Sequence, residues 1–164
     1  MDQVNGRTAK EISEMLLELT GDALLSGNFE TFAACFHLPH TIETPDYKRV
    51  LHSRMDLQAV FDSVTDDYRR KRVTRLVRIC EVAEFKSETR VEATHITHMM
   101  SGNQRVGEPF PNFSVLEFID GRWQATATQY AVDKTTTVGR AISGNARFRH
   151  TTAEDLRPAP KKEP

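Results

Sequence analysis

The six histidines are the residues of this 164-residue chain whose chemistry is most suggestive, because an imidazole exchanges protons near neutral pH. His40 and His52 are the best candidates for an acid or base in a pocket, since each borders a short strand-like segment. For each histidine taken singly, a hydrogen-bonded structural or surface group is the preferred interpretation. His95 and His98 are three positions apart in another strand-like segment, so they would face opposite sides of a sheet and could not bind one metal ion together. We therefore expect no metal site.

Glu117 is the carboxylate of most interest, because it shares one face of a predicted strand with Val115 and Ile119. A single acid on an apolar face is usually either paired or functional. We consider it as a third proton carrier beside His40 and His52. A salt bridge to a neighbouring strand, or a contact with a dimer partner, is the preferred interpretation.

Alanines alternate with larger side chains along residues 123–132, and Trp123 and Gln129 fall on the same face as these alanines. Small side chains beside one tryptophan leave room for a ligand. Trp123 would then form part of the wall of a mostly apolar pocket, and Gln129 would be a polar contact in it. Close packing of this face against a helix is the alternative, and it is the more conservative of the two.

A basic run at residues 68–72, followed by Arg75 and Arg78, resembles a phosphate-binding patch. The run also ends a predicted helix, where the helix dipole stabilises cations. Asp66 and Asp67, immediately before it, offset much of its charge. The whole chain has a net charge of -1, so it has no overall attraction for nucleic acid. We expect no nucleic-acid partner.

Cysteine usage and hydropathy indicate the compartment. Cys35 and Cys80 stand in apolar surroundings and form neither a disulfide framework nor a metal motif, which favours buried thiols in a reducing compartment. The polar N-terminal residues contain no apolar leader, and no run approaches the roughly 20 apolar residues of a membrane span. These features predict a cytoplasmic protein without a membrane partner.

The elements that must hold these side chains follow from the apolar periodicity. Asp120-Gly121 joins two strand-like segments and favours a type I′ turn, because both residues tolerate positive φ. Capping boxes at Thr8 and Ser53 predict the starts of two amphipathic helices, and Gly27 predicts the end of the first. The predicted helices span residues 9–26, 29–38 and 53–71, and the predicted strands span 40–44, 47–52, 73–85, 90–100, 113–119 and 123–132. The order α-α-β-β-α-β-β-β-β is typical of an α+β fold with helices on one face of an antiparallel sheet.

The glycine break at Gly27, the segment HTIETP at 40–45, the Ser53-capped helix and the final hairpin ending QATATQYAV resemble the nuclear transport factor 2-like superfamily. The SnoaL-like and ketosteroid-isomerase-like branch is the most similar. The resemblance implies a cone, in which a curved antiparallel sheet wraps around about three N-terminal helices. It also implies a pocket at the open end and a homodimer through the outer face of the sheet. The cone would comprise residues 1–132, and we expect 133–164 to form an extended, mobile tail.

The same resemblance allows the isomerase site to be located in this chain. The position of the catalytic base corresponds to Thr44, that of the oxyanion-binding phenol to Thr20, and that of the oxyanion-binding acid to Ser114. All three residues carry small hydroxyls, and a threonine cannot act as a base near neutral pH. The isomerase chemistry is therefore absent in this alignment, although a shift of one position would bring Glu43 into play. Thr20, Thr44 and Ser114 are expected to line a binding pocket.

These expectations lead to three hypotheses for function. The first is a protein that binds a small apolar or aromatic metabolite in the cone pocket and needs no cofactor. The second is a SnoaL-like isomerase, cyclase or dehydratase that uses His40, His52 or Glu117 as its acid or base. The third is an interaction module whose cone is filled by side chains and which binds a protein partner.

Overall fold

The computed structural model describes residues 3–132 and 137–142. In this part of the chain the helices are α1 (Ala9–Ser26), α2 (Phe29–Ala34), α3 (Arg54–Arg70) and α4 (Thr137–Ile142). The strands are β1 (Phe36–Thr44), β2 (Tyr47–Leu51), β3 (Arg75–Ser87), β4 (Arg90–Ser101), β5 (Gln104–Arg105), β6 (Phe110–Ile119) and β7 (Arg122–Tyr130). The predicted element order is confirmed, with the short strand β5 and the helix α4 added to it.

The two long helices begin where the sequence predicts. Thr8 and Glu11 form a capping box ahead of α1, and Ser53 and Asp56 form another ahead of α3. Gly27 ends α1 with a φ of 73°, a left-handed conformation that glycine adopts without a steric penalty. The second helix is shorter than predicted, because α2 ends at Ala34 and Phe36 is already the first residue of β1.

The strands form one sheet in the order β2-β1-β7-β6-β4-β3, with β5 paired to β4. Every pair in it is antiparallel except β1 with β7, which is parallel. The sheet is therefore mixed, and the prediction of a wholly antiparallel sheet is wrong at this pair. Only a hairpin forces neighbouring strands to run in opposite directions, and β1 and β7 are far apart in sequence.

The hairpin between β6 and β7 turns at Asp120 and Gly121, whose φ angles of 52° and 81° match the predicted type I′ turn. One irregularity follows in β7. Val115 pairs with Ala127 whereas Leu116 pairs with Ala125, so Thr126 is an extra residue in β7. Such a β-bulge exchanges the faces to which the following side chains point.

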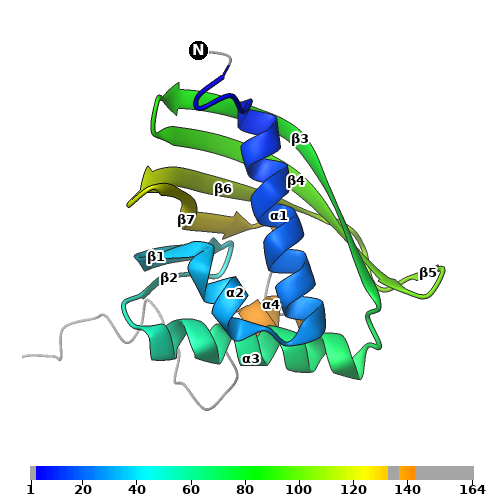
Figure 1. The fold of residues 1–164 in the computed structure, drawn as a ribbon. Coiled ribbons are helices and arrows are strands. Elements are labelled where there is room, and N and C mark those ends of the chain that lie inside the picture. The colour runs from blue at the N-terminus through cyan, green and yellow to red at the C-terminus, as the bar shows by residue number, and fades with distance from the viewer. Residues whose placement is uncertain (1–2, 133–136, 143–164) are drawn as a thin grey trace, which may run out of the picture.

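The helices lie on one side of the curved sheet and cover its concave face (Figure 1). There α1 crosses the sheet and packs chiefly on β3, while α2 and α4 pack against α3. The cone was predicted to end at residue 132, but α4 extends the packed structure, because Ala141 and Ile142 are buried. The remainder of the predicted tail, residues 133–136 and 143–164, lies outside the described residues. No described helix combines the length and the apolar character needed to cross a membrane.

Candidate functional site

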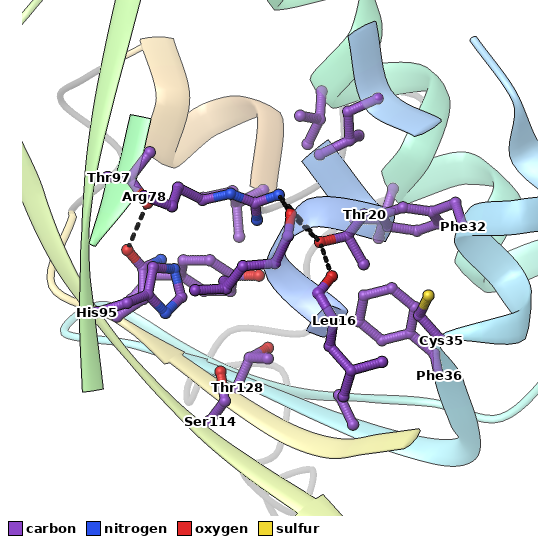
Figure 2. A pocket seen from close by; sticks show the side chains of 18 of the residues that line it. Leu16, Thr20, Phe32, Cys35, Phe36, Arg78, His95, Thr97, Ser114 and Thr128 are labelled. Carbon is purple, nitrogen blue, oxygen red and sulfur yellow. Dashed lines mark hydrogen bonds between the residues drawn. The ribbon is translucent and has the colours of Figure 1, made fainter. Parts of the chain in front are cut away.

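A cavity of about 110 Å³ lies between the helices and the concave face of the sheet (Figure 2). For comparison, an apolar cavity of about 150 Å³ can hold a benzene molecule. Most of the wall is apolar, as is usual for small-molecule sites. It is formed by Leu16, Leu17, Leu24, Phe32, Phe36, Val60, Val64, Phe110, Leu116, Ala125, Ala141 and Ile142.

Arg78 brings a positive charge to this apolar wall. Its side chain extends from β3 toward α1, where Nη2 donates hydrogen bonds to the carbonyl oxygen of Leu17 and, at 3.0 Å, to Oγ1 of Thr20 (Figure 2). The guanidinium also passes close to Gly21, where a Cβ atom would stand only 2.7 Å from Nη2. Burial lowers the pKa of Arg78, but an arginine side chain remains charged at neutral pH.

His95 reaches the cavity from the inner face of β4. Burial, and secondly the charge of Arg78, lower the pKa of His95 to about 3. The imidazole is therefore neutral at physiological pH and presents one N–H donor and one acceptor nitrogen. His98 lies on the opposite face of the strand, as the spacing predicts.

Polar groups from three strands complete the wall. Oγ1 of Thr97 on β4 donates a hydrogen bond to Oδ1 of Asn112 on β6, at 3.1 Å. Thr128 on β7 interacts with Tyr130 and with His40. Ser114 points into the cavity, and its hydroxyl has no hydrogen-bond partner among the described residues. The wall thus combines a few hydrogen-bonding groups with a large apolar surface.

His40 is buried directly behind this wall, with an exposed fraction of 1%. Both of its ring nitrogens are engaged, Nδ1 with the carbonyl oxygen of Ala125 and Nε2 with Oγ1 of Thr128, each at 3.1 Å. Burial lowers the pKa of His40 to about 4. The side chain does not line the cavity, and its contacts are those of a structural histidine that positions β7 against β1.

Two of the predicted acid–base residues lie away from the cavity. His52 is exposed, and its backbone N–H donates a hydrogen bond to Oδ2 of Asp56 at the start of α3. Glu117 lies on the outer face of β6, since Ser114 and Leu116 of the same strand point inward. Its carboxylate stands 3.9 Å from the Arg90 guanidinium, so the salt bridge to a neighbouring strand is the interpretation that the geometry favours.

The predicted ligand-binding residues divide into two groups. Thr20 and Ser114 line the cavity. Thr44 and Gln129 instead line a shallow groove elsewhere, in which Nε2 of Gln129 donates a hydrogen bond to Oε2 of Glu43 at 3.1 Å. The bulge at Thr126 explains the position of Gln129. Without the extra residue, Gln129 would point to the same face as Ala125, whereas with it Gln129 points to the opposite face.

Trp123 is buried but belongs to a second apolar cluster. Its ring packs against Phe85 and Phe118, at centroid distances of 6.3 and 5.5 Å. It borders a surface groove beside Met15 and Arg7 rather than the cavity. Close packing, the conservative alternative, therefore describes Trp123 better than a ligand contact does.

The basic run that resembled a phosphate site is largely paired. Asp67, which is 1% exposed, accepts a hydrogen bond from Nζ of Lys71 at 2.7 Å and lies 3.8 Å from the Arg70 guanidinium. Arg69 pairs with Asp66. Arg78 alone of this basic stretch enters the cavity. In residues 3–132 and 137–142, no group of three His, Cys, Asp or Glu side chains is placed to hold a metal ion.

Sequence reasoning missed Arg78 and His95 as pocket residues, although a signal was present. On a strand, Arg78 shares a face with Leu76 and Cys80, which are partly or fully buried. His95 shares its face with Ala93 and Met99 in the same way. A polar residue in phase with buried apolar neighbours must itself point into the core or into a cavity.

The arrangement of elements is shared with known structures. An NTF-2-like protein of unknown function from Shewanella oneidensis MR-1 superposes with a TM-score of 0.59 at 11% identity, over 73% of this chain and 96% of that one. A cystatin-like domain of unknown function from Nostoc punctiforme PCC 73102 gives 0.60 at 17% identity, over 77% and 79%. This chain has the nuclear transport factor 2-like fold.

A provisionally assigned scytalone dehydratase from Novosphingobium aromaticivorans DSM 12444 has the same fold, with a TM-score of 0.52 at 14% identity over 73% of this chain and 80% of that one. No family model matches the sequence, and no curated protein matches it either. At these identities the nuclear transport factor 2-like fold is what is shared, and fold alone does not determine function.

Proposed function

We propose that this protein binds a small, mostly apolar molecule in the cavity between its helices and the concave face of its sheet. The observation that carries the proposal is the composition of the wall, in which leucine, valine and phenylalanine side chains surround a few polar groups. Cavities with such walls bury the apolar surface of a ligand, while the few polar groups fix the ligand's orientation. The volume of about 110 Å³ is somewhat below the roughly 150 Å³ of a cavity that holds benzene, so the ligand is a short chain or at most one small ring.

The catalytic hypothesis has weaker support. His95 lines the cavity, but a base with a pKa of about 3 removes protons poorly near neutral pH, and its protonated form is scarcely populated. His40 has both nitrogens engaged, and His52 and Glu117 point elsewhere. The open volume also counts against a cone that is completely filled by side chains.

Filling the cavity is expected to abolish binding. Replacing Ser114 by leucine adds bulk to the wall and leaves no described hydrogen-bond partner unpaired. Benzamide, a neutral single-ring probe, should raise the Tm of the wild-type protein in a saturable way and should not raise that of Ser114→Leu. Thr89→Leu, at an exposed site in the turn between β3 and β4, is the matched control and should respond like the wild type. Equal stabilisation of Ser114→Leu would contradict the proposal.

We also propose that two copies of the chain associate through the outer face of the sheet. Ile79 and Val82 on this face of β3 are 49% and 56% exposed, and together they offer an apolar surface that a second copy of the chain could cover.

A charge at this surface is expected to separate the dimer. Val82→Glu should reduce the mass measured by light scattering from that of a dimer to that of a monomer, because a carboxylate would be desolvated at the contact. Met55→Glu, at a 76% exposed site on α3, should leave the mass unchanged. A wild-type protein that is already monomeric, or a Val82→Glu variant that is still dimeric, would exclude this interface.

A further inference from the structure

Arg78 is a partly buried cation whose described partners are all neutral. Its two hydrogen bonds, to the Leu17 carbonyl and to the Thr20 hydroxyl, both come from Nη2. Nε and Nη1 have no hydrogen-bond partner among the described residues. Within the same residues, Arg78 forms no ion pair with a carboxylate. Because desolvating a charge is costly, a buried guanidinium is ordinarily matched by an anion.

The nearby carboxylates do not supply that anion. Asp67 reaches the same cavity wall, but Lys71 and Arg70 already neutralise it. On the far side of Arg78, a surface groove along α1 carries Glu18 and Asp22, and the charge of Asp22 acts on Arg78 without forming an ion pair with it. These acids face the groove, so no carboxylate of residues 3–132 and 137–142 pairs with the guanidinium on its cavity side.

The groups around Arg78 also favour an anion. His95 is neutral and can donate one N–H, and the Ser114 hydroxyl can donate another hydrogen bond into the cavity. Nη2 already donates to Leu17 and Thr20, so a carboxylate would accept a hydrogen bond from Nη1. The opposite charges strengthen such a bond relative to one with a neutral ligand. The rest of the wall is apolar, which excludes a ligand that is charged over its whole surface.

We propose that the ligand is a small monocarboxylic acid, with one ring or a short apolar chain, whose carboxylate is bound by Arg78. This inference rests on the proposed small-molecule function and specifies its ligand class. The apolar part of such a molecule would lie against Leu16, Leu116 and Phe36, and its carboxylate would lie between Arg78 and His95.

The experiment compares two probes of the same size by titration calorimetry. Benzoate is anionic at neutral pH, and benzamide is its neutral counterpart. The wild-type protein should bind benzoate about tenfold or more tightly than benzamide, as a charge-assisted hydrogen-bond pair allows. Arg78→Met should lose this preference while retaining its affinity for benzamide. Arg75→Met, an exposed site on the same strand, removes the same charge and should retain the preference.

Each outcome bears on a different statement. Equal binding of the two probes by the wild type would overturn the carboxylate inference and leave the proposed small-molecule function standing. A benzoate preference that persists in Arg78→Met would also overturn it, because another group would then bind the anion. Binding of neither probe would overturn both statements. If Arg78→Met does not fold, Arg78→Gln serves in its place, since it removes the charge, keeps an N–H donor and should also lose the preference.

Discussion

Lowering the pH from 7 to 5 is expected to destabilise this protein by about 4 kcal/mol, before most carboxylates begin to titrate. The cause is two buried neutral histidines, His40 and His95, whose pKa values in the folded protein are about 4 and about 3 against an ordinary value of 6.5. Between these values the unfolded chain binds more protons than the folded one. The stabilising contribution of the two neutral histidines is therefore fully present above about pH 6.5. It is lost as the pH falls toward the pKa values that His40 and His95 have in the folded protein. Each histidine contributes about 2 kcal/mol of the loss down to pH 5.

Urea unfolding at pH 7 and at pH 5 measures this loss. The variant His40→Asn should lose about half of the pH dependence, although it will be less stable at both pH values because the contacts with Ala125 and Thr128 are disturbed. His52→Asn, at an exposed site, should keep the full dependence. Equal stability of the wild type at the two pH values would show that these histidines are accessible to protons in the folded state.

Replacing Phe61 by alanine is expected to lower the free energy of unfolding by about 3–5 kcal/mol. This side chain is 3% exposed and joins α3 to α2, because its ring lies 5.4 Å from that of Phe29 and 5.0 Å from that of Phe32, centroid to centroid. The substitution would leave a cavity between the two helices. Since Phe32 also lines the pocket, binding of small molecules should weaken together with stability.

Chemical denaturation of Phe61→Ala measures the loss, and Met55→Ala provides the control on the same helix. Met55 is largely exposed, so its removal should change stability by less than about 0.5 kcal/mol. A loss below about 1 kcal/mol in Phe61→Ala would mean that α2 does not depend on this aromatic cluster.

Local signals in the sequence were sufficient for the order of all elements except β5 and α4. The capping boxes at Thr8 and Ser53, the glycine at 27 and the turn at Asp120-Gly121 each satisfy backbone requirements that few other residues can meet. The parallel pairing of β1 with β7 was not predictable in this way, because it depends on how distant segments pack. Helix α4 was missed because its few residues carry a weak apolar pattern.

The pocket was predicted less completely than the fold. Thr20 and Ser114 line the cavity, and their role as ligand contacts stays a prediction. Gln129 was placed on the wrong face because a single extra residue, Thr126, shifts the alternation of β7. A bulge of this kind leaves no mark in residue composition. Arg78 was read as part of a basic run, although its phase with the buried face of β3 distinguishes it from the exposed arginines before it.

The central claim is that the cavity holds a small, mostly apolar molecule, and a methyl NMR titration of the wild-type protein with benzamide tests it most directly. We predict saturable shifts of methyl signals that line the cavity, among them Leu16, Leu116 and Ile142, with no change at Ile79 and Val82 on the outer face. Shifts confined to the outer face, or no saturable shift at any cavity methyl group, would contradict the account.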